Sequence, residues 1–330
     1  MKAILFCRMQ SLPAMVGFSD VEAAYGRIKD SVVKTPVMTS TTIDKLTSSE
    51  VFFKCENFQR VGAFKFRGAF NAISLLGEEE RKRGVITHSS GNHAQALALA
   101  ASKQDVRCTV VMPSSSPAVK MEATKGYGAE VVVCEPTLAS RQSTAAALIE
   151  KHGYTLVHPY DNPNIIAGAG TAAYELIKEI GSLDIVFVPV GGGGLLSGTS
   201  IATKGLLPEA HVIAGEPKGA DDAYRSFTAG KIHPSVNPHT IADGLLTSLS
   251  ELTFSIIRKN VDRIVTVSDQ EIVRAMRLLW ERMKIVVEPS GAVSLAALLQ
   301  ICDQLKERRI GVILSGGNVD LEPFFSQYAV

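Results

Sequence analysis

Short apolar or alternating runs recur along this chain, separated by longer stretches with helical periodicity. The short runs predict strands at residues 51–56, 85–87, 108–112, 130–134, 184–190, 211–215, 261–267 and 310–314. The longer stretches predict helices at residues 21–28, 42–46, 69–76, 94–102, 120–127, 143–152, 162–180, 195–206, 269–283 and 290–301. Because most of these strands are apolar throughout, the pattern predicts an α/β fold with parallel sheets covered by helices on both faces.

The stretch Val61–Phe70 stands where a predicted strand gives way to a helix, and it places Lys65 between Phe64 and Phe66. An amine between two phenyl rings loses hydration, which lowers its pKa. A neutral lysine amine is what a carbonyl cofactor needs to form a Schiff base. The alternative is an ordinary lysine whose charge reaches water.

Composition excludes several classes of protein. The 330 residues are 46% hydrophobic and 20% charged with a net charge of +1, typical of a globular protein that binds neither nucleic acid nor anionic membranes. The stretch Ala3–Cys7 is too short for a signal peptide or a membrane span, so Met1–Met15 is predicted to be a loose extension. The five cysteines are odd in number and widely spaced, which favours reduced thiols in a cytoplasmic protein. They are Cys7, Cys55, Cys108, Cys134 and Cys302.

Four consecutive glycines, Gly191–Gly194, separate a predicted buried strand from a helix. Exposed amides at a helix start form an anion cradle, and a structural turn would not need four glycines, so a phosphate site is favoured. The stretch also fits a dinucleotide fingerprint that ends at Ser197, with Glu216 where a ribose-binding acid belongs. A nicotinamide-dependent dehydrogenase therefore stays open as an alternative.

Three further polar segments lie at strand-to-helix or strand-end switches, where ligands gather in open α/β sheets. Ser89–His93 is a second anion cradle suited to a carboxylate, although a plain helix cap is the alternative. His93 alone would more often be a structural histidine. The other two segments are Glu288–Ser290 and Ser315–Asn318.

The order of these motifs, together with Ala242-Asp243-Gly244, resembles one family from about Phe18 to Leu321. The chain resembles pyridoxal-phosphate enzymes of the tryptophan-synthase-β-like fold (fold type II), in the serine/threonine dehydratase and serine racemase group. The resemblance implies two open, mostly parallel twisted sheets flanked by helices. It divides the chain into a large cofactor-binding domain, residues 1–78 and 160–330, and a small inserted domain, residues 84–158, that closes over substrate.

The resemblance also implies roles for individual residues. Lys65 would hold pyridoxal phosphate as an internal aldimine, Asn92 would bond the ring hydroxyl, and Ser315 the ring nitrogen. The expected cofactor-binding residues are Lys65, Phe64, Asn92, Gly191, Gly192, Gly193, Gly194, Leu195, Gly244, Glu288 and Ser315. The expected substrate-binding residues are Ser89, Ser90, Gly91, Asn92, His93 and Arg141.

A divalent cation is implied by the family's Glu-Pro-x-x-Ala-x-Asp pattern. The side chains of Glu216 and Asp222 and the carbonyl of Ala220 would supply oxygen ligands, which suit magnesium or calcium. A solvated acidic loop is the alternative.

The implied reaction is β-elimination from L-serine or L-threonine to a 2-oxo acid and ammonia, with Lys65 as the base at the α-carbon. Ser90 on the opposite ring face would permit serine racemisation as a second activity. Dehydration of 3-hydroxyaspartate is an alternative, with Arg141 binding the second carboxylate. A non-catalytic binding protein is an alternative of another class. A homodimer is expected from the family alone.

Overall fold

A computed structural model provides the structure of the chain and describes residues 16–116, 118–321 and 326. Cys7 and the predicted N-terminal extension lie outside the described residues. Within them, no helix is long and apolar enough to cross a membrane. The four described cysteines are free thiols, as predicted.

The larger sheet has the strand order β1-β2-β10-β7-β8-β9. All its pairs are parallel except β1 with β2, where Val37 opposes Lys54. Its strands are β1 (Val37–Met38), β2 (Glu50–Cys55), β7 (Ile185–Pro189), β8 (His211–Pro217), β9 (Arg263–Val267) and β10 (Arg309–Leu314).

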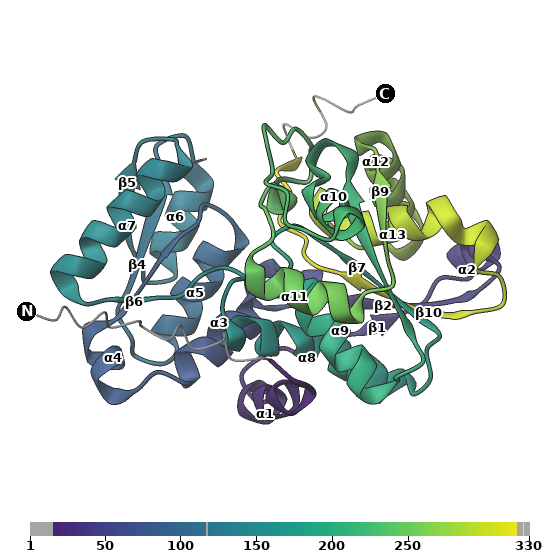
Figure 1. The fold of residues 1–330 in the computed structure, drawn as a ribbon, viewed down its shortest axis with the longest axis horizontal. Helices are drawn as coiled ribbons and strands as arrows, with labels where there is room; N and C mark the ends of the chain where they lie inside the picture. Colours follow the sequence, from purple (N-terminus) through teal and green to yellow (C-terminus); the bar gives the residue numbers. More distant parts are fainter. Residues whose placement is uncertain (1–15, 117, 322–325, 327–330) are drawn as a thin grey trace, which may run out of the picture.

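The smaller sheet is fully parallel, with the order β5-β4-β3-β6. It comes from one continuous part of the chain and forms a separate lobe, on the left in Figure 1. Its strands are β3 (Val85–His88), β4 (Cys108–Pro113), β5 (Glu130–Cys134) and β6 (Thr155–Leu156). The predicted α/β fold with two mostly parallel sheets is therefore confirmed.

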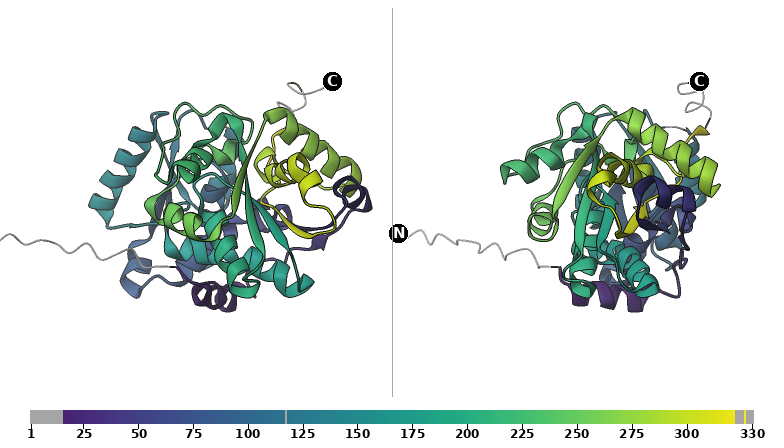
Figure 2. Two further views of the ribbon diagram at one scale, coloured as in Figure 1. Left: turned by 45° about the vertical axis from the view of Figure 1, so that its right-hand side comes forward. Right: turned by 90° about the vertical axis from the view of Figure 1, so that its right-hand side faces the viewer.

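Helices cover both faces of each sheet, as Figures 1 and 2 show. The α-helices are α1 (Phe18–Ile28), α2 (Thr41–Thr47), α3 (Lys65–Ser74), α4 (Glu78–Arg83), α5 (Asn92–Ser102), α6 (Ala118–Gly126), α7 (Leu138–His152), α8 (Pro163–Ile180), α9 (Gly194–Leu206), α10 (Asp222–Ala229), α11 (Glu251–Asn260), α12 (Asp269–Leu278) and α13 (Pro289–Ile301). A π-helix, η5 (Leu279–Met283), extends α12, and short 3₁₀ turns link other elements.

Alternate side chains of a strand point to opposite faces of the sheet, so each face packs against its own layer of helices. In β7, Ile185 and Phe187 face a core shared with α12 and α13, whereas Val186 and Val188 face a core shared with α8 and α9. A third core joins α3 and α5 to the smaller sheet. Helix α3 therefore lies between the two sheets.

A buried network of charges fixes α3 from behind. The Arg67 guanidinium donates to Glu56 at 2.7 Å and to Glu175 at 2.8 Å, and the Lys54 amine donates to Glu175 at 2.7 Å. Thr35 completes it through a 2.6 Å bond to Glu56. The network pairs two buried positive charges with two buried negative charges. Because water cannot replace these partners, the network joins α3, β2 and α8.

Candidate active site

Lys65 is the first residue of α3, and its amine faces the loop that returns from the smaller sheet. Its Nζ donates to the Pro159 carbonyl at 2.9 Å and lies 5.1 Å from the centre of the Phe64 ring. Burial lowers the pKa of Lys65 to about 8, against the attraction of Glu288, which raises it. A substantial neutral fraction near physiological pH makes this amine a competent nucleophile and base.

Phe66 does not share the role of Phe64. Its side chain is buried in the core of α3 and α5, with its ring centre 5.6 Å from that of Phe70. The expectation that two phenyl rings flank the amine is therefore wrong. On a helix, successive side chains point about 100° apart, so Phe64 and Phe66 cannot face the same side.

Ser89–His93 leads from β3 into α5, as predicted. Gly91 is the residue before the helix, and its amide lies 3.4 Å from the Ser89 hydroxyl. A Cβ added to Gly91 would meet nothing within 4 Å, so open space faces this turn. Ser89, Ser90 and Asn92 are each half-buried around it. A helix start beside open space suits a carboxylate.

The His93 side chain turns away from that space. Its Nε2 lies 3.1 Å from the Val157 carbonyl, and its side chain is buried. Burial lowers the pKa of His93 to about 3, with the Lys65 charge as a second cause. The ring is therefore neutral and tied to the backbone through Nε2, while its Nδ1 is buried with no hydrogen-bond partner among the described residues.

The tetraglycine turn joins β7 to α9, with Gly193 at φ +87° as the helix cap. A Cβ on Gly192 would lie 2.3 Å from the Tyr160 ring, and one on Gly191 would lie 2.8 Å from the Leu245 backbone. Crowding and a left-handed residue thus require glycine whatever binds there. The argument that a structural turn would not need four glycines is wrong, although the first-turn amides of α9 still form an anion cradle.

The predicted ring-binding residues gather at the carboxyl ends of β10 and β3. Ser315 is buried at the end of β10, and its carbonyl accepts from the Phe64 amide at 3.0 Å. The Asn92 amide donates to the two oxygens of Glu288 at 2.9 and 3.1 Å. The Gly244 amide donates to Ser290 at 3.0 Å. Motifs from distant parts of the sequence therefore meet around Lys65.

Arg141, near the start of α7, lies close enough to His88 for its charge to act on that ring. It is half-buried, and its Nε is buried with no hydrogen-bond partner among the described residues. Burial lowers the pKa of His88, at the end of β3, and the Arg141 charge lowers it further. The His88 ring centre lies 5.7 Å from that of His158, whose pKa burial lowers to about 4. A cation beside two neutral imidazoles can receive an anionic side chain.

Sequence reasoning missed His88, His158 and Tyr160. The last two flank Pro159, and their rings meet edge to face with centres 4.7 Å apart. The signal available for His88 was its position at the carboxyl end of a predicted strand. Nothing local marks Tyr160, which becomes recognisable only where the chain returns against Gly192.

The proposed side-chain ligands Glu216, at the end of β8, and Asp222, at the start of α10, are buried, not solvated. Both oxygens of Glu216 accept backbone amides, from Ala223 at 2.8 Å and Tyr224 at 2.7 Å. Both oxygens of Asp222 are buried and make no well-formed hydrogen bond among the described residues. The Ser235 hydroxyl and the Leu249 backbone still lie near enough to lower its pKa against burial. Burial raises the pKa of Glu216 to about 9 and that of Asp222 to about 6. No group of three or more His, Cys, Asp or Glu in the described part of the chain could hold a metal.

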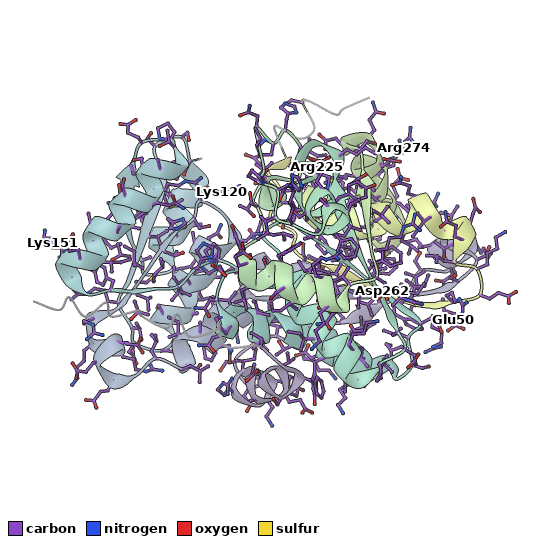
Figure 3. The ribbon with its side chains drawn as sticks, viewed as in Figure 1. Glu50, Lys120, Lys151, Arg225, Asp262 and Arg274 are labelled. Atoms are coloured by element: carbon purple, nitrogen blue, oxygen red, sulfur yellow. The ribbon has the colours of Figure 1, made fainter. Side chains whose placement is uncertain are left out.

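One ion pair connects the two lobes beside the site. The Lys120 amine, on the side of the smaller lobe that faces the larger one in Figure 3, donates to Asp243 at 2.9 Å. A surface hollow of about 500 Å³ lies elsewhere, at the amino ends of β7, β8 and β10, lined by Asp184, His211 and Arg308. Because ligands of open α/β sheets bind at carboxyl ends, the chemistry belongs to the Lys65 side.

Residues 28–316 match a family described as "Pyridoxal-phosphate dependent enzyme". The chain is 51% identical over 312 residues to serine racemase from Dictyostelium discoideum, covering 93% of this chain and 96% of that protein. It is 49% identical over 308 residues to L-threo-3-hydroxyaspartate ammonia-lyase from Saccharomyces cerevisiae, covering 93% and 94%. The crystal structure of a T.th. threonine deaminase superposes with a TM-score of 0.87 at 43% identity, covering 92% and 99%.

Proposed function

Because this chain belongs to the family of pyridoxal-phosphate dependent enzymes, we propose that it converts L-serine and L-threonine to 2-oxo acids and ammonia and also racemises serine. The chain is an enzyme, and membership of this family favours pyridoxal phosphate over the nicotinamide cofactor of a dehydrogenase. The observation that carries the proposal is the Lys65 amine, which is desolvated and held by the Pro159 carbonyl. Relatives named serine racemase and threonine deaminase support both activities.

The residues present fit this cofactor. Lys65 would bind its aldehyde, and the first-turn amides of α9 behind Gly191–Gly194 would bind its phosphate. Asn92 would donate to the ring hydroxyl, and the Ser315 hydroxyl would face the ring nitrogen. Bound pyridoxal phosphate supplies an electron sink for the negative charge left when the α-proton is removed.

The protein's own groups would then divide the proton transfers. Lys65 would take the α-proton from one face, helped by its lowered pKa and by the Pro159 carbonyl that orients it. Ser90, half-buried on the neighbouring turn, would serve the other face and permit racemisation. A hydroxyl at Ser315 leaves the ring nitrogen without a charged partner, which favours prompt loss of the β-hydroxyl.

Product analysis tests this proposal directly. The chain with pyridoxal phosphate should release 2-oxo acid and ammonia from L-serine and form D-serine from the same substrate. Its visible absorption band should disappear in Lys65→Ala and persist in Lys34→Ala, a control at an exposed lysine. A chain that binds pyridoxal phosphate without a visible band that depends on Lys65 would contradict the proposal.

A second candidate substrate is 3-hydroxyaspartate. The unpartnered Nε of Arg141 beside His88 favours it, because a second carboxylate would complete those hydrogen bonds. Relatives named 3-hydroxyaspartate ammonia-lyase support the same substrate. Turnover of serine, threonine and 3-hydroxyaspartate, compared at equal concentration, ranks the three.

We further propose a divalent cation at the acidic turn. Two buried carboxyl groups, one with no well-formed hydrogen bond in the described chain, fit a positive ion with Glu216, Asp222 and the Ala220 carbonyl as ligands. Oxygen ligands suit magnesium or calcium. Binding would release protons, because both carboxyl groups hold theirs more tightly than usual.

The proposed assembly is a cytoplasmic homodimer with a mobile small domain. Phe58 and Val286 are exposed apolar side chains. They belong to neighbouring segments, since Asn57, next to Phe58, donates to the Val286 carbonyl at 3.1 Å. Together they support an interface. Residues 84–158 would form the closing domain against residues 1–78 and 160–330, with the ion pair of Lys120 and Asp243 across the gap. Reduced cysteines support the cytoplasm. Sedimentation of wild type and Phe58→Asp tests the dimer.

A further inference from the structure

Asn92, Glu288 and Asn318 form a closed ring of hydrogen bonds between three separate segments. The Asn92 amide donates to Glu288 at 2.9 and 3.1 Å, and the Asn318 backbone amide donates to the same carboxylate at 3.1 Å. The Asn318 side chain closes the ring by donating to Asn92 Oδ1 at 2.9 Å. The three residues lie at the start of α5, just before α13, and beyond β10.

The polarity of this ring leaves Asn92 one orientation. An ionised carboxylate only accepts hydrogen bonds, so Glu288 must face the NH₂ of Asn92. The side-chain NH₂ of Asn318 also donates to the Val61 carbonyl at 2.6 Å. This bond identifies the NH₂ end of the Asn318 side chain, and the same NH₂ donates to Asn92 Oδ1. One N–H of Asn92 can serve both carboxylate oxygens, and the other remains available in a fixed direction.

Glu288 does not serve its own helix. It is the N-cap residue of α13, yet its side chain makes no capping hydrogen bond. The carboxylate instead lies buried beneath Gly316, where an added Cβ would come within 2.5 Å of Oε1. A glutamate at a helix start that turns away from the helix is serving another group.

That other group includes Lys65. Glu288 is the acidic group that raises the pKa of Lys65 against burial. Asp243 and Lys120 are the other charged groups that act on Glu288, and they act in opposite directions. Burial raises the pKa of Glu288 itself to about 7, so its charge is present near and above neutral pH.

We propose that Glu288 is a positioning residue: its carboxylate holds the Asn92 amide with one N–H directed at the cofactor, and it provides the negative partner of the Lys65 nitrogen. This inference rests on the proposed function, since the cofactor must occupy the site for the fixed N–H to matter. It assigns Glu288 to two groups that touch the cofactor, with no direct part in proton transfer.

The test compares Glu288→Gln with Asp243→Asn. Each removes one negative charge, Asp243 being a group that acts on Glu288. Only the first disturbs Asn92, because a glutamine presents an NH₂ that opposes either Asn92 or the Asn318 amide. Pyridoxal phosphate is titrated into cofactor-free protein, and its dissociation constant and the pH midpoint of the visible band are measured. We expect Glu288→Gln to weaken binding about tenfold and to shift the midpoint to lower pH. Asp243→Asn should leave binding within about twofold.

A third variant, Asn318→Ala, separates the effect of a misoriented Asn92 side chain from the effect of losing the Glu288 charge. It removes one anchor of Asn92 from an exposed position and keeps Glu288, so binding should weaken while the pH midpoint stays unchanged. Wild-type binding and midpoint in Glu288→Gln, or equal weakening by Asp243→Asn, would overturn the inference. A wild-type chain that forms no visible band would instead refute the proposed function, and unfolding midpoints of the cofactor-free proteins identify any variant that fails to fold.

Discussion

Replacing Arg67 by methionine tests the buried charge network behind α3. Methionine keeps most of the volume but leaves Glu56 without its positive partner and Glu175 with only Lys54. Breaking a buried ion pair on one side costs about 3–5 kcal/mol, because the remaining charge stays out of water. We therefore expect Arg67→Met to lower the free energy of unfolding by about 3–5 kcal/mol at pH 8.

A matched control is available on the surface. The Arg277 guanidinium lies 2.7 Å from Glu281, the same distance as between Arg67 and Glu56, but its side chain is 74% exposed. Arg277→Met should leave the free energy of unfolding nearly unchanged, since water screens the exposed pair. Equal distances with unequal burial isolate the effect of the missing solvent.

The loss of unfolding free energy in Arg67→Met should depend on pH. Burial raises the pKa of Glu175, but the hydrogen bonds and charges of Arg67 and Lys54 together outweigh it, so this pKa is lowered in the folded wild type. Its contribution to stability is therefore present above pH 4.5 and is lost as pH falls. Without Arg67, the effect of burial on this pKa is opposed by Lys54 alone, so the deficit of the variant should grow as pH rises and shrink as pH falls toward pH 4.

Urea unfolding of the cofactor-free proteins, followed by circular dichroism between pH 4 and pH 8, measures both quantities. A deficit below about 1 kcal/mol at pH 8, or one that does not change with pH, would refute the idea that Arg67 compensates buried carboxylates. A deficit as large in Arg277→Met would show that the assay does not report burial.

Four further outcomes follow from the site. Ser90→Ala should abolish serine racemisation and spare elimination from L-serine; equal loss of both activities would contradict a two-base site. Gly192→Ala should raise the dissociation constant of pyridoxal phosphate at least about tenfold through its clash with Tyr160, as measured by titration of the visible band. Arg141→Met should lower kcat/KM for 3-hydroxyaspartate at least about a hundredfold and that for serine much less. Asp222→Asn should remove the rise in unfolding midpoint that magnesium gives the wild type, which a calorimetric scan with and without chelator would detect.

The sequence predicts the strands and the polar segments at their ends because both signals are local. Uniformly apolar runs mark β7 and β10, and the turns after them are rich in glycine and serine. Strands β1 and β6 have only two residues each, too few to show a periodic pattern, so the sequence did not predict them. Helices α4, α10 and α11 were not predicted either.

What the sequence could not supply is contact between distant segments. Tyr160 and Gly192 are neighbours only because the segment after β6 returns to the turn that follows β7. The link from Asn92 to Glu288 spans 196 residues and depends on both sheets being in place. The misplacement of Phe66 has a simpler cause, since a motif written in a line hides the turn of a helix between its residues.

The separation of Lys65 and Arg141 has a consequence for how such enzymes diversify. The reactive amine starts a helix that a charge network ties to β2 of the larger sheet, whereas the arginine belongs to α7, on the face of the smaller sheet opposite to α5. Substitutions that retune which amino acid enters can therefore accumulate around α7 without disturbing the amine anchored at the start of α3. Exchange of α7 between relatives of differing specificity, with Ser90 and Asn92 left in place, should transfer preference while preserving catalysis.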